Sequence, residues 1–199
     1  VEQLLKEALK SYEVNYGKTH TAVPTILLNL GEFYRQQGNF EEAESCFLKA
    51  LAIREKLMGS KSEQVGEIFD RLGALFETGG DISKSGQYFF RALEVWEHIL
   101  GPTHEEVIQR INDLVVLYRV YGHFQKAEPL YVKLLALREG DADAPSIDAV
   151  PDLCALALFY QVQSKYSQAE PLFAKALETL TEHHGPGVNH PDLAWVHSL

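Results

Sequence analysis

The chain has 199 residues, of which 46% are hydrophobic and 23% are charged. It can therefore bury a core, and its composition is not that of a disordered tail. Its formal net charge of −10 disfavours nucleic acid and anionic lipid as partners, because phosphates would be repelled at long range. The sequence has no apolar run near the roughly 18 residues that a membrane-spanning helix needs, so we expect no membrane partner either.

The sequence repeats itself with a step of 42 residues, as the spacing of Leu30, Leu72, Leu114 and Leu156 shows. The same step relates an aromatic position and a turn position. The aromatic residues are Phe47, Phe89, Tyr131 and Phe173, and the turn residues are Gly38, Gly80, Gly122 and Ser164. Such a period is typical of repeat architectures, in which neighbouring units share one continuous core.

Within each copy the apolar residues follow helical spacing. Leu27, Leu30 and Tyr34 lie on one helical face, and Ala43 and Phe47 lie on another after the glycine turn. Each copy is therefore predicted to be two antiparallel helices, which we name helix A and helix B in chain order. Small residues such as Gly31 and Gly73 would allow the two helices to approach closely.

In chain order, we expect an unpaired helix B, four hairpins and a last helix A. Their predicted bounds are 1–17 for the unpaired helix B, then 21–59, 63–101, 105–140 and 147–185 for the four hairpins, and 190–199 for the last helix A. Because neither end has the polar cap that a repeat array needs, we also expect the chain to be a piece of a longer protein.

Some positions depart from the repeat. Ser85 and Gly86 replace better helix formers in the second helix B, which should loosen that unit by around 1 kcal/mol. The segment from Glu139 to Pro145 breaks the third helix B early, so 140–147 is expected to be an irregular, mobile loop. Prolines enter the third and fourth helices B at one shared phase.

These features resemble the tetratricopeptide repeat, in which helix A carries Leu-Gly/Ala-x-x-Tyr and helix B carries Ala-x-x-x-Phe-x-x-Ala. Residues 29–59 match this pattern nearly throughout. The 42-residue step and the Gly-x-x-His linkers, such as 17–20 and 101–104, are similar to the variety found in kinesin light chains. The resemblance implies an all-α fold, a right-handed superhelix or α-solenoid of antiparallel helical hairpins.

No pattern in the sequence indicates catalysis. It contains no phosphate-binding loop, no HExxH and no GxSxG motif. His183, His184, His190 and His197 are the best metal candidates, but we expect them to be solvent-exposed and His190 to serve in a linker, as do His20 and His104. We therefore predict no enzyme activity, no cofactor and no metal. Cys46 and Cys154 lack ligand spacing and are read as structural thiols, which favours the cytoplasm.

The resemblance implies that helix A lines a concave groove, and the repeat phase gives the residues that should point into it. The predicted groove residues are Leu28, Asn29, Arg35, Gln36, Asp70, Arg71, Glu77, Asn112, Asp113, Arg119 and Gln161. Asparagine and arginine can bond a peptide backbone or pair with its carboxylates. Each of these side chains could instead be part of a solvated polar helix face. Along the fourth copy the groove turns apolar, with Ala155 and Val162, which favours hydrophobic ligand side chains there.

Three functions are open at this point. The first is a protein-interaction scaffold or adaptor that binds a short linear peptide of a partner, with the arginines favouring an acidic motif. The second is the sensor or autoinhibitory arm of a larger multidomain signalling NTPase or other enzyme. The third is self-association through the uncapped ends.

Overall fold

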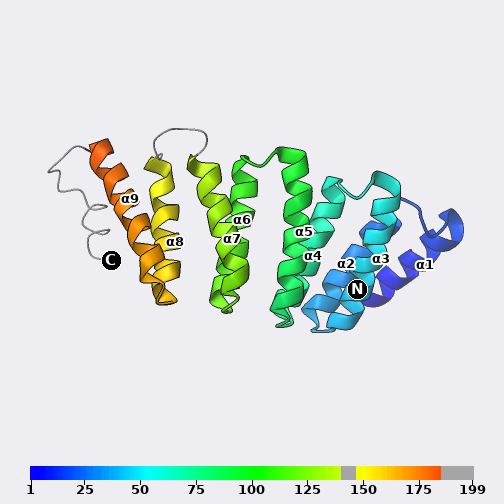
Figure 1. Cartoon of the computed structure of the whole chain (residues 1–199). Helices are drawn as coiled ribbons and strands as arrows, with labels where there is room; N and C mark the ends of the chain where they lie inside the picture. The colour runs from blue at the N-terminus through cyan, green and yellow to red at the C-terminus, as the bar shows by residue number, and fades with distance from the viewer. Residues whose placement is uncertain (140–146, 185–199) are drawn as a thin grey trace. The chain divides into compact units, whose positions relative to one another are not determined.

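The computed structural model describes residues 1–139 and 147–184, and in this part of the chain every regular element is helical (Figure 1). The α-helices are α1 (Glu2–Tyr16), α2 (Val23–Gln36), α3 (Phe40–Met58), α4 (Glu63–Thr78), α5 (Ile82–Leu100), α6 (Glu105–Val120), α7 (Phe124–Glu139), α8 (Val150–Val162) and α9 (Tyr166–His184). A short 3₁₀ helix, η1 (Ile147–Ala149), precedes α8. The predicted loop at 140–147 and helix at 190–199 fall almost wholly outside the described residues.

The chain forms two compact units, Val1–Arg110 and Ile111–Leu199. In the first unit α2 packs against α3 and α4 against α5, while α3 also packs against α4 and α1 against α2. In the second unit α8 packs against α9 and α7 against α8. Sequential helical pairs are the arrangement that the repeat predicted, and the all-α solenoid architecture is confirmed.

Glycine makes the turns inside the hairpins. Gly38, Gly80 and Gly122 have φ values of 76°, 82° and 74°, a left-handed conformation that costs glycine nothing but strains other residues. Ser164 occupies the same phase in the fourth copy with a φ of 59°, the one positive φ of a non-glycine residue in the described chain. The turn positions predicted from the repeat are thus confirmed.

The helices of a hairpin are in close contact where helix A has a glycine. A Cβ atom added at Gly31 would lie 2.5 Å from Cε1 of Phe47, and one added at Gly73 would lie 2.6 Å from Cδ1 of Phe89. The aromatic ring of helix B therefore lies directly on the glycine of its own hairpin. Ala43 and Leu51 of α3 complete the buried face in the first hairpin.

The linker histidines form hydrogen bonds with the backbone at the starts of helices A. Nδ1 of His104 accepts from the backbone N–H of Glu106 at 3.2 Å, which satisfies one of the free N–H groups in the first turn of α6. Nδ1 of His20 accepts from the backbone N–H of Ala22 at 3.2 Å, the residue that precedes α2. These bonds confirm a linker hydrogen-bonding role for both residues. His190 lies outside the described residues.

None of the helices in the described ranges is both long enough and apolar enough to cross a membrane. The two cysteines are buried and do not form a disulfide. Burial raises the pKa of Cys154 to about 11 and also raises the pKa of Cys46, so both thiols stay protonated near neutral pH. They behave as core residues.

Candidate protein-binding groove

The predicted groove residues of the first repeat are largely occupied with one another. Arg35 donates to both carboxylate oxygens of Glu32, through Nε at 3.0 Å and Nη2 at 2.6 Å, and Gln36 donates to the same carboxylate at 3.2 Å. The Arg35 hydrogen bonds hold the pKa of Glu32 below its usual value. Arg35 is therefore neutralised on its own helix and has little charge left for an acidic ligand.

Asp70 is also engaged within the first unit. Its carboxylate accepts from the Trp96 indole at 3.1 Å and from Nη1 of Arg110 at 2.7 Å. The Arg110 guanidinium stacks 4.6 Å from the centre of the Trp96 ring and also pairs with Glu106 at 3.3 Å. Burial raises the pKa of Asp70, although Arg110 and the indole oppose that rise. Asp70, Trp96 and Arg110 form a closed polar cluster, which we call the 70–96–110 cluster.

The other predicted residues of the first unit lie on the surface of helices A. Leu28 is half-buried, whereas Asn29, Arg71 and Glu77 are exposed. The charge of Arg71 contributes to lowering the pKa of Glu32, which places its guanidinium near the Glu32–Arg35 pair. This surface is mixed in charge.

A groove of about 470 Å³ lies within the second unit. Its walls are α6, with Asn112, Val115, Val116 and Arg119, and α8, with Asp152, Ala155, Leu158, Phe159 and Val162, while Phe124 and Tyr131 come from α7. A volume of several hundred Å³ and a mainly apolar lining with a few polar groups are typical of ligand sites. This groove is the best candidate for a functional site in the described chain.

The rims of the groove are apolar and open to solvent. Val116 on α6 is 48% exposed, and Val162 on α8 is 76% exposed. Val120, one helical turn after Val116, is 65% exposed. Aliphatic side chains left in water in this way favour contact with apolar groups of a partner.

The polar groups of the groove have different environments. Asp152 is only 8% exposed, and its Oδ2 atom forms an ion pair with Nε of Arg138 at 2.8 Å. Burial raises the pKa of Asp152 more than Arg138 lowers it. Burial also raises the pKa of Tyr131, which feels the charges of both Arg119 and Asp152 and so lies close to them. Arg119 is exposed and pairs with no carboxylate of the described residues.

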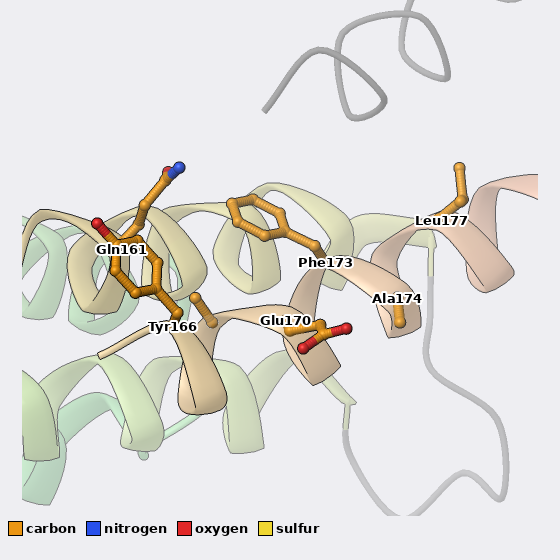
Figure 2. Close-up of a pocket in the computed structure, with 7 residues that line it drawn as sticks. Gln161, Tyr166, Glu170, Phe173, Ala174 and Leu177 are labelled. Atoms are coloured by element: carbon orange, nitrogen blue, oxygen red, sulfur yellow. The ribbon is translucent and has the colours of Figure 1, made fainter. Parts of the chain in front are cut away.

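A second pocket, of about 370 Å³, lies along α9 with a contribution from Gln161 of α8 (Figure 2). Tyr166, Glu170, Phe173 and Leu177 line it from α9. In the first hairpin the residues in phase with Phe173 and Leu177 are Phe47 and Leu51, which are fully buried in a helix that packs against α4. The repeat positions that are buried in the first hairpin thus line an open pocket in the fourth.

The structure brings Asn112 and Arg119 of the predicted set together in one groove, and it places Gln161 at the second pocket. Asp113 is exposed and takes part in an interaction of its own. Sequence reasoning missed the contributions of Val116, Tyr131 and Asp152. The signal for Val116 was present, because it follows Asn112 by four residues and so lies on the same helical face.

The described residues contain no group of three or more potential ligands that could hold a metal ion. His183 is exposed, as expected. The position of the His184 side chain and the structures at His190 and His197 lie outside what is described.

Comparisons with known proteins identify families and solved structures that share this architecture. Models of the tetratricopeptide repeat match residues 23–89 and 153–192, which together take in more than half of the chain. No curated protein matches the sequence. Among solved structures, BtubC (BKLC) from P. vanneervenii is similar with a TM-score of 0.58 and 22% identity, over 95% of this chain and 75% of that one.

Two further structures share the fold. The kinesin light chain nearly identical TPR-like repeats from Podosopora anserina align with a TM-score of 0.54 and 17% identity, over 89% of this chain and 83% of that one. MamA aligns with a TM-score of 0.50 and 19% identity, over 92% of this chain and 88% of the MamA chain. Likenesses at this level of identity concern the fold. With the sequential helical pairs and the two family matches, they show that the chain belongs to the tetratricopeptide repeat family, with kinesin-light-chain-like structural neighbours.

Proposed function

We propose that the chain is an adaptor segment that holds a short peptide of another protein in the groove between α6 and α8. Tetratricopeptide repeat proteins generally mediate protein–protein interactions, and only these repeats are evident in the chain. The observation that supports this groove as the site is its combination of exposed valines with the polar residues Asn112 and Arg119. An apolar interior with a few polar groups provides affinity and orientation at once.

The environment of each arginine favours Arg119 as the residue that selects an acidic peptide. Arg35 is bonded to Glu32, whereas Arg119 has an apolar residue, Val116, at the position that corresponds to Glu32. An unpaired guanidinium beside apolar surface can pair with a carboxylate at little competing cost. The preferred peptide would therefore carry a bulky aliphatic or aromatic side chain for the valine rims and an acidic residue for Arg119.

Fluorescence anisotropy with labelled peptides would test the proposal. One peptide set should combine acidic and bulky apolar residues, and a second set should replace each acidic residue by lysine. Arg119→Glu should weaken binding of the acidic set about tenfold or more, as expected for reversing one charge of a partly desolvated pair. Arg35→Glu is the matched control and should change the affinity little. Equal effects of the two substitutions, or unchanged binding in both, would reject the groove assignment.

The division into an unpaired helix and four hairpins with the bounds given above stays a prediction, as do self-association and a place in a larger signalling enzyme. We assign the chain no cofactor, and we propose protein or peptide as its class of partner.

A further inference from the structure

The two units contain equivalent sets of three positions, and only one set is closed. In the first unit the set is the 70–96–110 cluster, in which the Asp70 carboxylate accepts from both other members. Adding one 42-residue repeat to each number gives Asn112, Arg138 and Asp152 in the second unit. The same three places in the repeat therefore hold a different chemistry, which we call the 112–138–152 set.

The 112–138–152 set leaves hydrogen-bonding capacity unused. Oδ2 of Asp152 lies 2.8 Å from Nε of Arg138 in an ion pair but has no hydrogen-bond partner, and no described residue donates to Oδ1. The Asn112 amide likewise has no partner among the residues with described structure. Buried polar groups normally find partners, because an unmade hydrogen bond in a poorly solvated place is costly. Asp152 is 8% exposed and lines the groove together with Asn112.

The charges around the set select against ionic ligand groups. A cation approaching Asp152 would meet the positive charges of Arg138 and Arg119, and an anion at the same place would meet the Asp152 carboxylate. Asp152 Oδ1 can only accept a hydrogen bond while ionised, whereas Asn112 can both donate and accept. A neutral carboxamide fits both, since its N–H₂ can donate to Asp152 and its carbonyl oxygen can accept from Asn112.

We propose that the 112–138–152 set recognises the carboxamide side chain of a glutamine or asparagine in the protein segment that occupies the groove. The proposal rests on the proposed function and adds to it a third feature of the ligand. Beside an apolar residue between the valine rims and an acidic residue at Arg119, the segment carries a neutral amide directed to the groove wall at Asp152. In the first unit the equivalent place is closed by Trp96 and Arg110, so it has no such preference.

Three small probes with similar branched aliphatic parts separate the alternatives: isobutyramide, isobutyrate and isobutylammonium. Each is titrated into the isotope-labelled chain, and NMR shifts are followed at the Asn112 side-chain N–H₂, the methyl groups of Val116 and Val162, and Nε–H of Arg119. Isobutyramide should give saturable shifts at Asn112 and both valines, and it should bind most tightly of the three. Isobutyrate should shift Arg119 and leave the Asn112 amide nearly unchanged.

Two variants test the assignment to these residues, with saturation read from the valine methyls. Asn112→Leu places there the residue that the first repeat has at this phase, Leu28, and should weaken isobutyramide binding about fivefold, the value of one neutral hydrogen bond. The triple variant Asn112→Asp, Arg138→Trp, Asp152→Arg copies the closed 70–96–110 cluster into the second unit and should remove the preference for the amide over the anion. Asn29→Leu, at an exposed asparagine of the first unit, is the control and should leave isobutyramide binding unchanged.

The outcomes separate this inference from the proposed function. If isobutyrate or isobutylammonium binds as tightly as isobutyramide, or if Asn112→Leu has no effect, the carboxamide preference is wrong. In those cases binding of acidic-apolar peptides with dependence on Arg119 would still stand. If isobutyramide shows the expected pattern while no peptide binds, the amide site holds and the peptide-binding proposal fails.

Discussion

Replacing Gly31 by alanine should destabilise the first hairpin, although alanine is the better helix former. A Cβ atom at this position would lie 2.5 Å from Cε1 and 2.7 Å from Cδ1 of Phe47. Carbon atoms in contact are normally about 3.5–4.0 Å apart, so the overlap is about 1 Å. The Phe47 side chain is 0% exposed, so other groups of the core enclose the ring.

The magnitude follows from two opposing effects. Overpacking a core lowers the free energy of unfolding by about 1–3 kcal/mol. The higher helix propensity of alanine relative to glycine raises it by about 1 kcal/mol. Because the ring is fully enclosed, we expect a cost near the upper end and a net loss of about 1–2 kcal/mol in the free energy of unfolding. In the fourth copy Ala157 takes the glycine position, and there the aromatic partner Phe173 is only half-buried.

Urea denaturation followed by far-ultraviolet circular dichroism measures this effect. In a Phe47→Leu background, where the ring is absent, the cost of Gly31→Ala should shrink or reverse, which a double-mutant cycle reports as coupling. Ala157→Gly serves as a propensity control and should lose only about 1 kcal/mol. An increase in unfolding free energy for Gly31→Ala alone would show that the ring yields and would refute the steric reasoning.

Three further predictions concern single residues. Ser85 is fully buried and its hydroxyl has no partner among the described residues, so Ser85→Ala should raise the midpoint of urea unfolding by an amount equivalent to about 1–3 kcal/mol; an unchanged midpoint would indicate that a partner is present. The pKa of Asp152 is raised by burial, so the folded state holds this proton at pH values where the unfolded state has lost it. The unfolding free energy of the wild type relative to Asp152→Asn should therefore fall as pH rises from 3.5 to 6, and a rise would mean that the Arg138 ion pair outweighs burial. Cys154, with its pKa raised to about 11, should react with iodoacetamide in urea but hardly at all in the native chain, as mass spectrometry would record.

The arginines of helix A show how one repeat phase can carry two roles. Arg35 and Arg119 occupy the same phase, yet one is bonded to Glu32 and the other faces an apolar groove. The difference originates in the residue three positions earlier, which is Glu32 in one copy and Val116 in the other. A glutamate at that distance lies on the same helical face and neutralises the arginine, whereas valine cannot. An array of similar units can in this way confine ligand contacts to one part of its length.

The sequence alone determined the helices, the turns and the repeat. The signals for these features act over only a few residues, so they can be recognised from the sequence without knowledge of the fold. They are the helical spacing of apolar residues, turn glycines such as Gly38 and the linker histidine His104. The 42-residue step then required neighbouring hairpins to pack in sequence. These signals are local or periodic, and the structure confirms them.

Only the tertiary structure decided which polar side chains remain available to a ligand. Asp70 was predicted to face the groove, but its carboxylate accepts hydrogen bonds from Trp96 and Arg110, which are 26 and 40 positions away. No local sequence pattern predicts partners at such distances. Asp152 had no role in the sequence reading and proved to be a nearly buried carboxylate in the groove wall. Hydrogen bonding between distant residues depends on how the helices pack against each other. Burial then determines whether a carboxylate oxygen without a partner can still accept a hydrogen bond from a ligand.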